Sequence, residues 1–137
     1  MSMTTERTAS APRWMLWTGW ILSSLVAAQL LSSAFFRATV HTAAVAEIVT
    51  SYGYPESAIV RIVTAECLLV VLYLVPQTSV LAAIVMTGYL GGAVATHLRI
   101  ADSARAVIPL LEGILAWGGL YLRDRRIREL IPLRRSA

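Results

Sequence analysis

The chain has 137 residues, of which 57% are hydrophobic and 15% are charged; its mean hydropathy is +0.66 and its formal net charge is +4. A soluble domain of this length has too little interior to bury so much apolar surface, so the composition predicts one membrane domain. The single cysteine excludes an internal disulfide and a Cys-x-x-Cys redox pair.

The first hydrophobic segment, residues 14–36, is an uncharged run between Arg13 and Arg37. A helix needs about 20 apolar residues to cross a bilayer, and the apolar core of a signal peptide is shorter, about 7–15 residues. The segment is therefore predicted to be an uncleaved first transmembrane helix. Residues 1–13 before it are predicted to form a disordered tail.

The connection after the first span carries apolar residues at helical spacing. Val45, Ile48, Val49 and Tyr52 follow an i, i+3, i+4, i+7 pattern, and Glu47 lies off that stripe. This pattern predicts a short amphipathic helix that lies on the outer surface between the first and second spans.

A long segment without Asp, Glu, Lys or Arg lies between Glu66 and Arg99. It is too long for one span, and the sequence PQTS at 76–79 interrupts it with residues that favour a turn. The segment is therefore predicted to be a hairpin of two spans, at about 57–75 and 80–98.

The fourth span is predicted at residues 106–122, where Glu112 is the one residue of the types Asp, Glu, Lys and Arg. Together the four spans predict an all-α, polytopic bundle over residues 14–122, with both termini on the same side of the membrane. Residues 123–137 are predicted to be a basic tail.

The arginines predict the orientation of the bundle, because positively charged residues concentrate on the cytoplasmic side. We therefore expect both termini in the cytoplasm of a bacterium and the spans in its inner membrane. The basic tail is expected to contact anionic lipid and not nucleic acid, since no aromatic residues interleave with its arginines. Eight arginines lie on the terminal side, at 7, 13, 123, 125, 126, 128, 134 and 135, and four on the other, at 37, 61, 99 and 105.

Polar residues within the spans gather in the outer half of the predicted bundle. An ionisable side chain in a membrane is costly, so each of these residues is a site candidate. They predict a polar pocket that opens toward the outside. The candidates are Gln29, Arg37, Glu66, His97, Arg99 and Glu112.

Several of these residues also have a purely structural interpretation. Glu66 can be a protonated acid that bonds Gln29 or a backbone carbonyl and fixes helix packing. Glu112 can form a partial ion pair with Arg105, seven residues away on the same face. Tyr89, like Tyr73 in the second span, is interpreted as a packing residue.

The stretch GYLGGAVATHLR, residues 88–99, raises the question of a phosphate-binding loop. No lysine follows its glycines, and the stretch lies inside a predicted span, so a phosphate loop is excluded. Gly88 and Gly92 form a G-x-x-x-G pair, which is typical of a helix-packing seam in membranes. Gly118 and Gly119 offer a second seam on the fourth span.

Metal and haem sites find little support in the sequence. Haem ligation of the bis-histidine type needs two axial ligands, but His41 and His97 are the two histidines and His41 is predicted to lie outside the bundle. No spacing of His, Cys, Asp and Glu suits a metal ion. No metal site is therefore predicted.

Several motifs together resemble one family. These are GYPES, the segment LVPQTSVLAAIVMTGYLGGAVATHLR and the segment WGGLYLRDRRIRELIPLRR. In this combination the chain resembles the DoxX-like family of small bacterial membrane proteins. The resemblance implies a four-helix membrane bundle, and some relatives are subunits of quinone-linked or thiol-linked oxidoreductase complexes. It also implies a lysine after the first helix, where this chain has Arg37.

Three function classes remain open from the sequence. The first is a membrane subunit of a redox complex whose outer pocket holds a quinone-like molecule, with Glu66 or His97 handling protons. The second is a proton-coupled transporter that uses Glu66, and the third is a scaffold or chaperone for a partner protein in the bilayer. No nucleophile–base spacing predicts an autonomous enzyme, and no catalytic residue is assigned. Self-association stays open.

Overall fold

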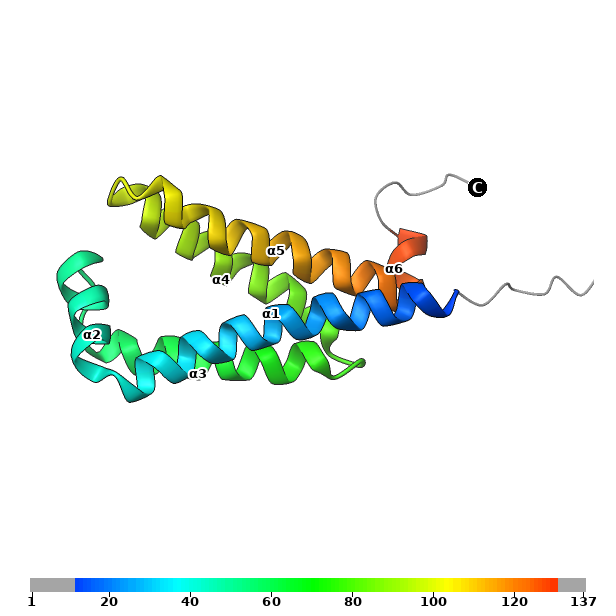
Figure 1. The fold of residues 1–137 in the computed structure, drawn as a ribbon, viewed down its shortest axis with the longest axis horizontal. Helices are drawn as coiled ribbons and strands as arrows, with labels where there is room; N and C mark the ends of the chain where they lie inside the picture. The colour runs from blue at the N-terminus through cyan, green and yellow to red at the C-terminus, as the bar shows by residue number, and fades with distance from the viewer. Residues whose placement is uncertain (1–11, 131–137) are drawn as a thin grey trace, which may run out of the picture.

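The computed structural model describes residues 12–130 of the chain (Figure 1). These residues form helices and no strand, which confirms the predicted all-α fold. The predicted tail at 1–13 lies outside the described residues except for its last two. The four long helices are α1 (Arg13–Thr39), α3 (Ser57–Leu74), α4 (Ser79–Arg99) and α5 (Ser103–Arg123), and the short elements are α2 (His41–Val45), the π-helical turn η1 (Ala46–Ser51) and α6 (Arg125–Leu130).

The four long helices pack in a ring. α1 contacts α3 and α5, and α4 contacts the same two helices from the other side. We call the end that holds the start of α1 and helix α6 the terminal end, and the opposite end the α2 end. Toward the α2 end, α1 and α3 diverge from α4 and α5 (Figure 1).

Each long helix is long and apolar enough to cross a membrane. In the most apolar window of each helix only 28–33% of the residues are buried inside the bundle. The remaining surface carries large apolar side chains, among them Trp17, Phe35 and Ile114. Such a surface is suited to lipid, so the predicted four-span membrane bundle is confirmed.

The helices extend beyond the predicted spans at most ends, because the sequence criterion stopped at the first charged residue. α1 includes Arg37 and ends at Thr39, and α5 begins at Ser103 instead of residue 106. Asp102 caps α5 by accepting the backbone N–H of Arg105 at 3.2 Å. A helix ends where its backbone groups find a cap, and this point need not coincide with the end of the apolar run.

The terminal half of the bundle is closed by backbone contact between α1 and α5. A Cβ atom added at Gly19 would lie 2.8 Å from the carbonyl oxygen of Gly119, and one added at Gly119 would lie 2.7 Å from Ser23 Oγ. Gly119 therefore lies in a tight seam, whereas a Cβ atom at Gly118 would meet Leu22 Cδ1 at 3.9 Å. Glycine at these crossings lets the two helices approach closely.

Tyr73 of α3 fills the middle of this closed half and is fully buried. Its hydroxyl donates to the carbonyl oxygen of Ala116 at 2.6 Å and lies 3.1 Å from Ser23 Oγ. The tyrosine thus joins α1, α3 and α5 through hydrogen bonds as well as packing, which goes beyond the predicted packing role.

The connection between α1 and α3 forms the predicted short amphipathic helix, made of α2 and η1. Ile48 and Tyr52 are buried in a small apolar cluster with Ala44 and Ile59 at the α2 end. The helix covers this end of the bundle. The side of the membrane on which it lies stays a prediction.

The predicted basic tail, residues 123–137, starts at the last residue of α5 and includes helix α6, whose Ile127 is buried against the bundle. Residues 131–137 of that tail lie outside the described residues.

Candidate functional site

The carboxylate of Glu66 is almost completely buried in the middle of the bundle, with 3% of its side chain exposed. It forms an ion pair with Arg37 of α1, whose Nη1 lies 2.9 Å from Oε1 and 3.1 Å from Oε2. A buried carboxylate without a partner would be strongly destabilising, so this pair explains how the bundle tolerates Glu66.

Two hydroxyl groups complete the surroundings of Glu66. Tyr89 of α4 donates to Oε1 at 2.7 Å, and Ser33 of α1 donates to the same oxygen at 3.2 Å. Arg37 also donates to Ser33 Oγ. The network therefore joins three helices, α1, α3 and α4, through one carboxylate.

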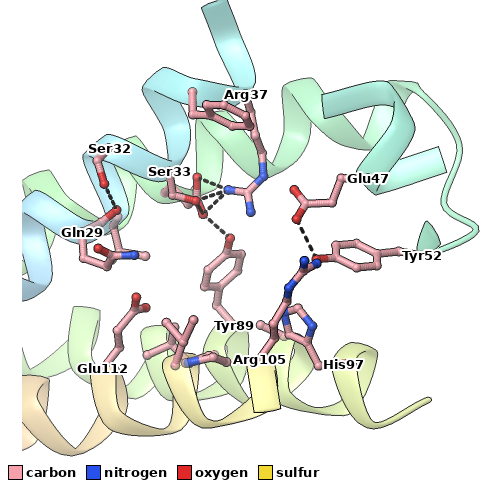
Figure 2. Close-up of a pocket in the computed structure, with 17 residues that line it drawn as sticks. Gln29, Ser32, Ser33, Arg37, Glu47, Tyr52, Tyr89, His97, Arg105 and Glu112 are labelled. Carbon is pink, nitrogen blue, oxygen red and sulfur yellow. Dashed lines mark hydrogen bonds and ion pairs between the residues drawn. The ribbon is translucent and has the colours of Figure 1, made fainter. Parts of the chain in front are cut away.

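A cavity of about 440 Å³ lies beside this network, and we call it the α1–α5 cavity. Side chains from α1 and η1 face side chains from α4 and α5 across it (Figure 2). Its charged lining residues are two arginines and three glutamates. These residues are Arg37, Arg105, Glu47, Glu66 and Glu112.

Glu112 and His97 are lining residues with free hydrogen-bonding capacity, and so are Gln29, whose side-chain amide has no partner within residues 12–130, and Arg37, whose Nε is buried without one. Within residues 12–130 the Glu112 carboxylate has no hydrogen bond or ion pair, and Nδ1 of His97 is buried without a partner. The expected ion pair between Arg105 and Glu112 does not form, because Arg105 pairs with Asp102 at 3.3 Å, one helical turn away. Glu112 and His97 are therefore two of the groups that a ligand in this cavity could engage.

The π-helical turn supplies the side of the cavity nearest the α2 end. Glu47 and Tyr52 are five residues apart, a spacing that a π-helical turn aligns on one face, and the Tyr52 hydroxyl donates to Glu47 Oε1 at 2.9 Å. Burial, together with the hydrogen bond and negative charge of Glu47, raises the pKa of Tyr52 from 10.0 to about 12. The phenol therefore stays protonated and keeps donating at neutral pH.

A second cavity of about 390 Å³ lies between α3 and α4, and we call it the α3–α4 cavity. The two cavities share a wall of residues that line both, namely Arg37, Tyr52, Tyr89, Ala93 and His97. The ring of Tyr52 meets the ring of His97 edge to face, with 5.4 Å between centroids, which holds the imidazole in this wall. The two cavities are thus neighbours that have part of their lining in common.

A family model with the description DoxX-like family matches residues 21–119. The chain belongs to the DoxX-like family. It is accordingly a multi-pass integral membrane protein, with four helices suited to span the bilayer. No curated protein and no solved structure matches it. All residues that line the two cavities of this DoxX-like protein fall within the matched segment.

The structure brings together most of the site residues that the sequence predicts for this DoxX-like protein. Five of the six candidates line the α1–α5 cavity; Arg99 does not, because it donates to the carbonyl of Tyr52 and lies over the ring of Tyr54. The proposed bond between Glu66 and Gln29 is wrong, since Arg37, Ser33 and Tyr89 take up the carboxylate. The five are Gln29, Arg37, Glu66, His97 and Glu112.

Tyr89, Glu47 and Tyr52 are among the lining residues that the sequence does not identify as site candidates. The sequence favours a packing role for Tyr89, whereas its spacing from Gly92 and Ala93 places it on the face that meets α3. Glu47 and Tyr52 were separated because an α-helical pattern puts positions five apart on different faces. No sequence signal indicated the π-helical turn that aligns them.

The glycine seam predicted on α4 does not pack inside the chain. A Cβ atom at Gly88 or Gly92 would meet nothing within 4 Å among the described residues, and both glycines line the α3–α4 cavity. They leave space where the sequence suggested contact.

Proposed function

We propose that this DoxX-like protein is a membrane subunit of a quinone-linked or thiol-linked redox complex, and that the α1–α5 cavity binds the head group of a quinone-like molecule. One observation carries this proposal: a cavity with a polar interior and an apolar rim lies between the membrane-spanning helices and the η1 turn at their α2 end. Its volume of about 440 Å³ falls in the range of small-molecule sites, about 300–1,000 Å³.

The rim of the cavity is suited to entry from the bilayer. Phe36 of α1 and Ile108 of α5 line the cavity and are 47% and 51% exposed on the outer surface of the bundle. A ligand with an apolar tail could leave that tail in lipid between α1 and α5. This geometry favours an amphipathic molecule over a hydrophilic one.

The interior of the cavity fits the oxygens of such a head group. His97 Nδ1 and the Glu112 carboxylate have no partners within residues 12–130, so they can hydrogen-bond a ligand without breaking an existing contact. A bound quinone would supply two-electron, two-proton chemistry, with the electrons exchanged through a partner redox protein. In this proposal His97 and Glu112 position the head group and hold protons, while Glu66 stays fixed by Arg37.

We further propose that both termini lie in the cytoplasm of a bacterium and that the spans lie in its inner membrane. The arginine distribution supports this orientation, because basic residues concentrate at the terminal end of the bundle. Reporter fusions at the C-terminus and in the loop after α4 would test it. Activity of a cytoplasmic reporter in the loop fusion alone would contradict the orientation.

The binding proposal can be tested by extracting bound small molecules from protein purified out of its own membranes in mild detergent. We expect mass spectrometry to find a quinone or similar amphiphile in the wild type and about tenfold less in His97→Asn and in Glu112→Gln, since a lost hydrogen bond to a charged or buried group costs about 1.5–3 kcal/mol. The chain offers matched controls in His41→Asn and Glu56→Gln, which alter an exposed pair at the α2 end outside this cavity.

Equal ligand retention by all four variants would contradict the proposal. A wild-type protein that carries no amphiphile beyond bulk phospholipid would contradict it as well. Co-purification of a redox protein with the wild type would support the role as a subunit, whereas a reproducible partner without redox centres would favour a scaffold.

Transport is the second candidate function, and the unpaired Glu112 favours it. A proton-coupled carrier needs a carboxylate that can exchange protons within the membrane, and Glu66 is less suited because Arg37 holds it in an ion pair. We would measure proton-coupled flux in proteoliposomes of the wild type and of Glu112→Gln. Equal flux would contradict a role of Glu112 in transport.

A further inference from the structure

We infer that the α3–α4 cavity is a separate site for an anionic amphiphile, with the acidic head group at Arg61 and an acyl chain over Gly88 and Gly92. This inference does not depend on the ligand of the α1–α5 cavity, because these three residues line the α3–α4 cavity alone.

The two glycines of α4 create the space for an acyl chain. Both glycines are exposed, and both line the cavity. Apart from its chain neighbours and the nearby backbone of α4, a Cβ atom added at either glycine would meet no described heavy atom within 4 Å. A larger side chain there would extend into the cavity. The facing wall from α3 is apolar at Ala58 and Ile62, which suits hydrocarbon.

The charges around the cavity select an anion. Its lining includes no carboxylate, in contrast to the three that line the α1–α5 cavity. Arg61 is exposed at the mouth and forms no ion pair within residues 12–130, whereas Arg37 is already bound to Glu66. A cation in this position attracts an acidic head group.

A second arginine adds to this positive charge. The guanidinium of Arg99 lies 5.7 Å from the ring centroid of Tyr54, and Tyr54 lines the cavity. The Tyr54 hydroxyl is 2.8 Å from Thr96 Oγ1, and both residues line the cavity, so this pair offers hydroxyl groups at head-group level.

Arg61 lies at the depth expected for the head group of an amphiphile, and Gly88 and Gly92 lie at the depth expected for its acyl chain. At about 1.5 Å per residue, Arg61 lies about 6 Å from the start of α3, which is within reach of the membrane interface for a long side chain. On the same scale Gly92 and Gly88 lie about 10 Å and about 16 Å from the end of α4, at the depth of acyl chains. Charge at the interface and free space below it therefore occur in one cavity.

The shared chemistry is an anionic head on an acyl chain, and it can come from an acidic phospholipid or from a fatty acid. We would incubate the detergent-solubilised protein with an equimolar mixture of dioleoylphosphatidylglycerol and dioleoylphosphatidylcholine and count retained lipids by native mass spectrometry. We expect the wild type to retain phosphatidylglycerol preferentially. Arg61→Gln should reduce this preference about fivefold, because one basic residue near an anionic surface contributes about 1 kcal/mol.

Gly92→Leu should reduce retention of both lipids, because its side chain fills the cavity. Matched controls are Gly91→Leu, one residue along α4 and outside both cavities, and Arg125→Gln, a surface arginine paired with Glu129 at the terminal end. Both controls should behave like the wild type. Added oleate that displaces phosphatidylglycerol would identify a fatty acid as sufficient, whereas no displacement would assign the phospholipid.

Three results would overturn the inference. They are equal retention of the two lipids by the wild type, an unchanged preference in Arg61→Gln, and a Gly92→Leu protein that retains lipid as Gly91→Leu does. None of these results bears on the α1–α5 cavity, whose ligand is followed through His97 and Glu112.

Discussion

The two halves of the bundle use similar residue types with opposite results. At the terminal end, Gly19 and Gly119 bring the backbones of α1 and α5 into contact, and buried Tyr73 fills the interior. Toward the α2 end, Gly88 and Gly92 have nothing opposite them and leave a cavity. A glycine therefore closes a bundle where a second small residue faces it, and opens the bundle where none does.

The arginines of the two halves differ in the same way. Arg123 lies between the rings of Trp20 and Tyr73, 4.6 and 4.7 Å from their centroids, and donates to the Tyr73 carbonyl at 2.6 Å. Arg37 instead binds a buried carboxylate beside a cavity. The terminal half is thus stabilised by packing, and the other half by a polar network whose surroundings can accept a ligand.

The largest effect is expected from breaking the ion pair of the α2 half with Arg37→Met. The change leaves Glu66 buried with only Ser33 and Tyr89, and loss of one partner of a buried pair costs about 3–5 kcal/mol in free energy of unfolding. Equilibrium unfolding in detergent would measure this loss.

The double variant Arg37→Met/Glu66→Leu is the control for this experiment, because it removes both charges together. It should be clearly more stable than Arg37→Met alone, since no unpaired charge remains. Strictly additive losses would show that the two residues are not energetically coupled.

The next largest effect is expected from substituting Gly119, which lies in a tight seam, and Gly92, which faces open space. Gly119→Ala should lower the free energy of unfolding by about 1–3 kcal/mol, because the new methyl group would lie 2.7 Å from Ser23 Oγ and 3.0 Å from the Gly19 carbonyl. Gly92→Ala meets no atom within 4 Å and should instead raise it by up to about 1 kcal/mol, through the higher helix propensity of alanine.

Thermal unfolding of these two variants and of Gly91→Ala would check this contrast. Equal destabilisation by Gly119→Ala and Gly92→Ala would show that the open face of α4 is covered, and would remove the distinction between the halves.

The features of this fold that can be predicted from the sequence are those that depend on hydrophobicity and charge. The four spans and the amphipathic helix follow from periodicity and from the absence of charge. The polar candidates gather in one region because their positions along the spans place them at a similar depth in the membrane. These are one-dimensional properties, so residue order alone is sufficient to find them.

Pairing across helices was harder to predict, because it depends on helix rotation and spacing. Gln29 is one of two alternative partners that the sequence suggests for Glu66, the other being a backbone carbonyl, but Glu66 pairs with Arg37, two turns further along α1. The G-x-x-x-G pair of α4 was expected to make a contact, yet the same pattern is compatible with free space. Which outcome occurs depends on the facing helix, which the local sequence does not reveal.

A smaller effect should distinguish the tyrosines of the two halves. Tyr73→Phe removes a buried hydrogen bond to Ala116 and should lower the free energy of unfolding by about 1 kcal/mol without changing what the α1–α5 cavity retains. Tyr89→Phe removes the bond to Glu66 and should alter ligand retention as well, because Tyr89 lines the cavity. Parallel unfolding and extraction measurements would test this, and identical behaviour of the two variants would contradict it.

The smallest effect concerns the titration of Tyr52 at the α2 end. The pKa of Tyr52 in the folded protein is raised from 10.0 to about 12 by burial and then by Glu47. Between these values the unfolded state loses its phenolic proton first, so the contribution of Tyr52 to stability is complete below pH 10 and is lost as the pH rises toward 12. Glu47→Gln removes the negative charge and weakens the hydrogen bond, and should therefore bring the pKa of Tyr52 closer to 10.

The difference in near-ultraviolet tyrosinate absorbance between each protein and its Tyr52→Phe version isolates this one phenol. Glu56→Gln, which changes an exposed carboxylate paired with His41, is the matched control and should leave the titration unchanged. If Glu47→Gln titrates like the wild type, burial alone explains the shift, and Glu47 is then free to interact with a ligand in the α1–α5 cavity. If its pKa falls, the bond between Glu47 and Tyr52 persists in the membrane and holds the imidazole of His97 through the Tyr52 ring, so the wall between the two cavities is fixed from the α2 end.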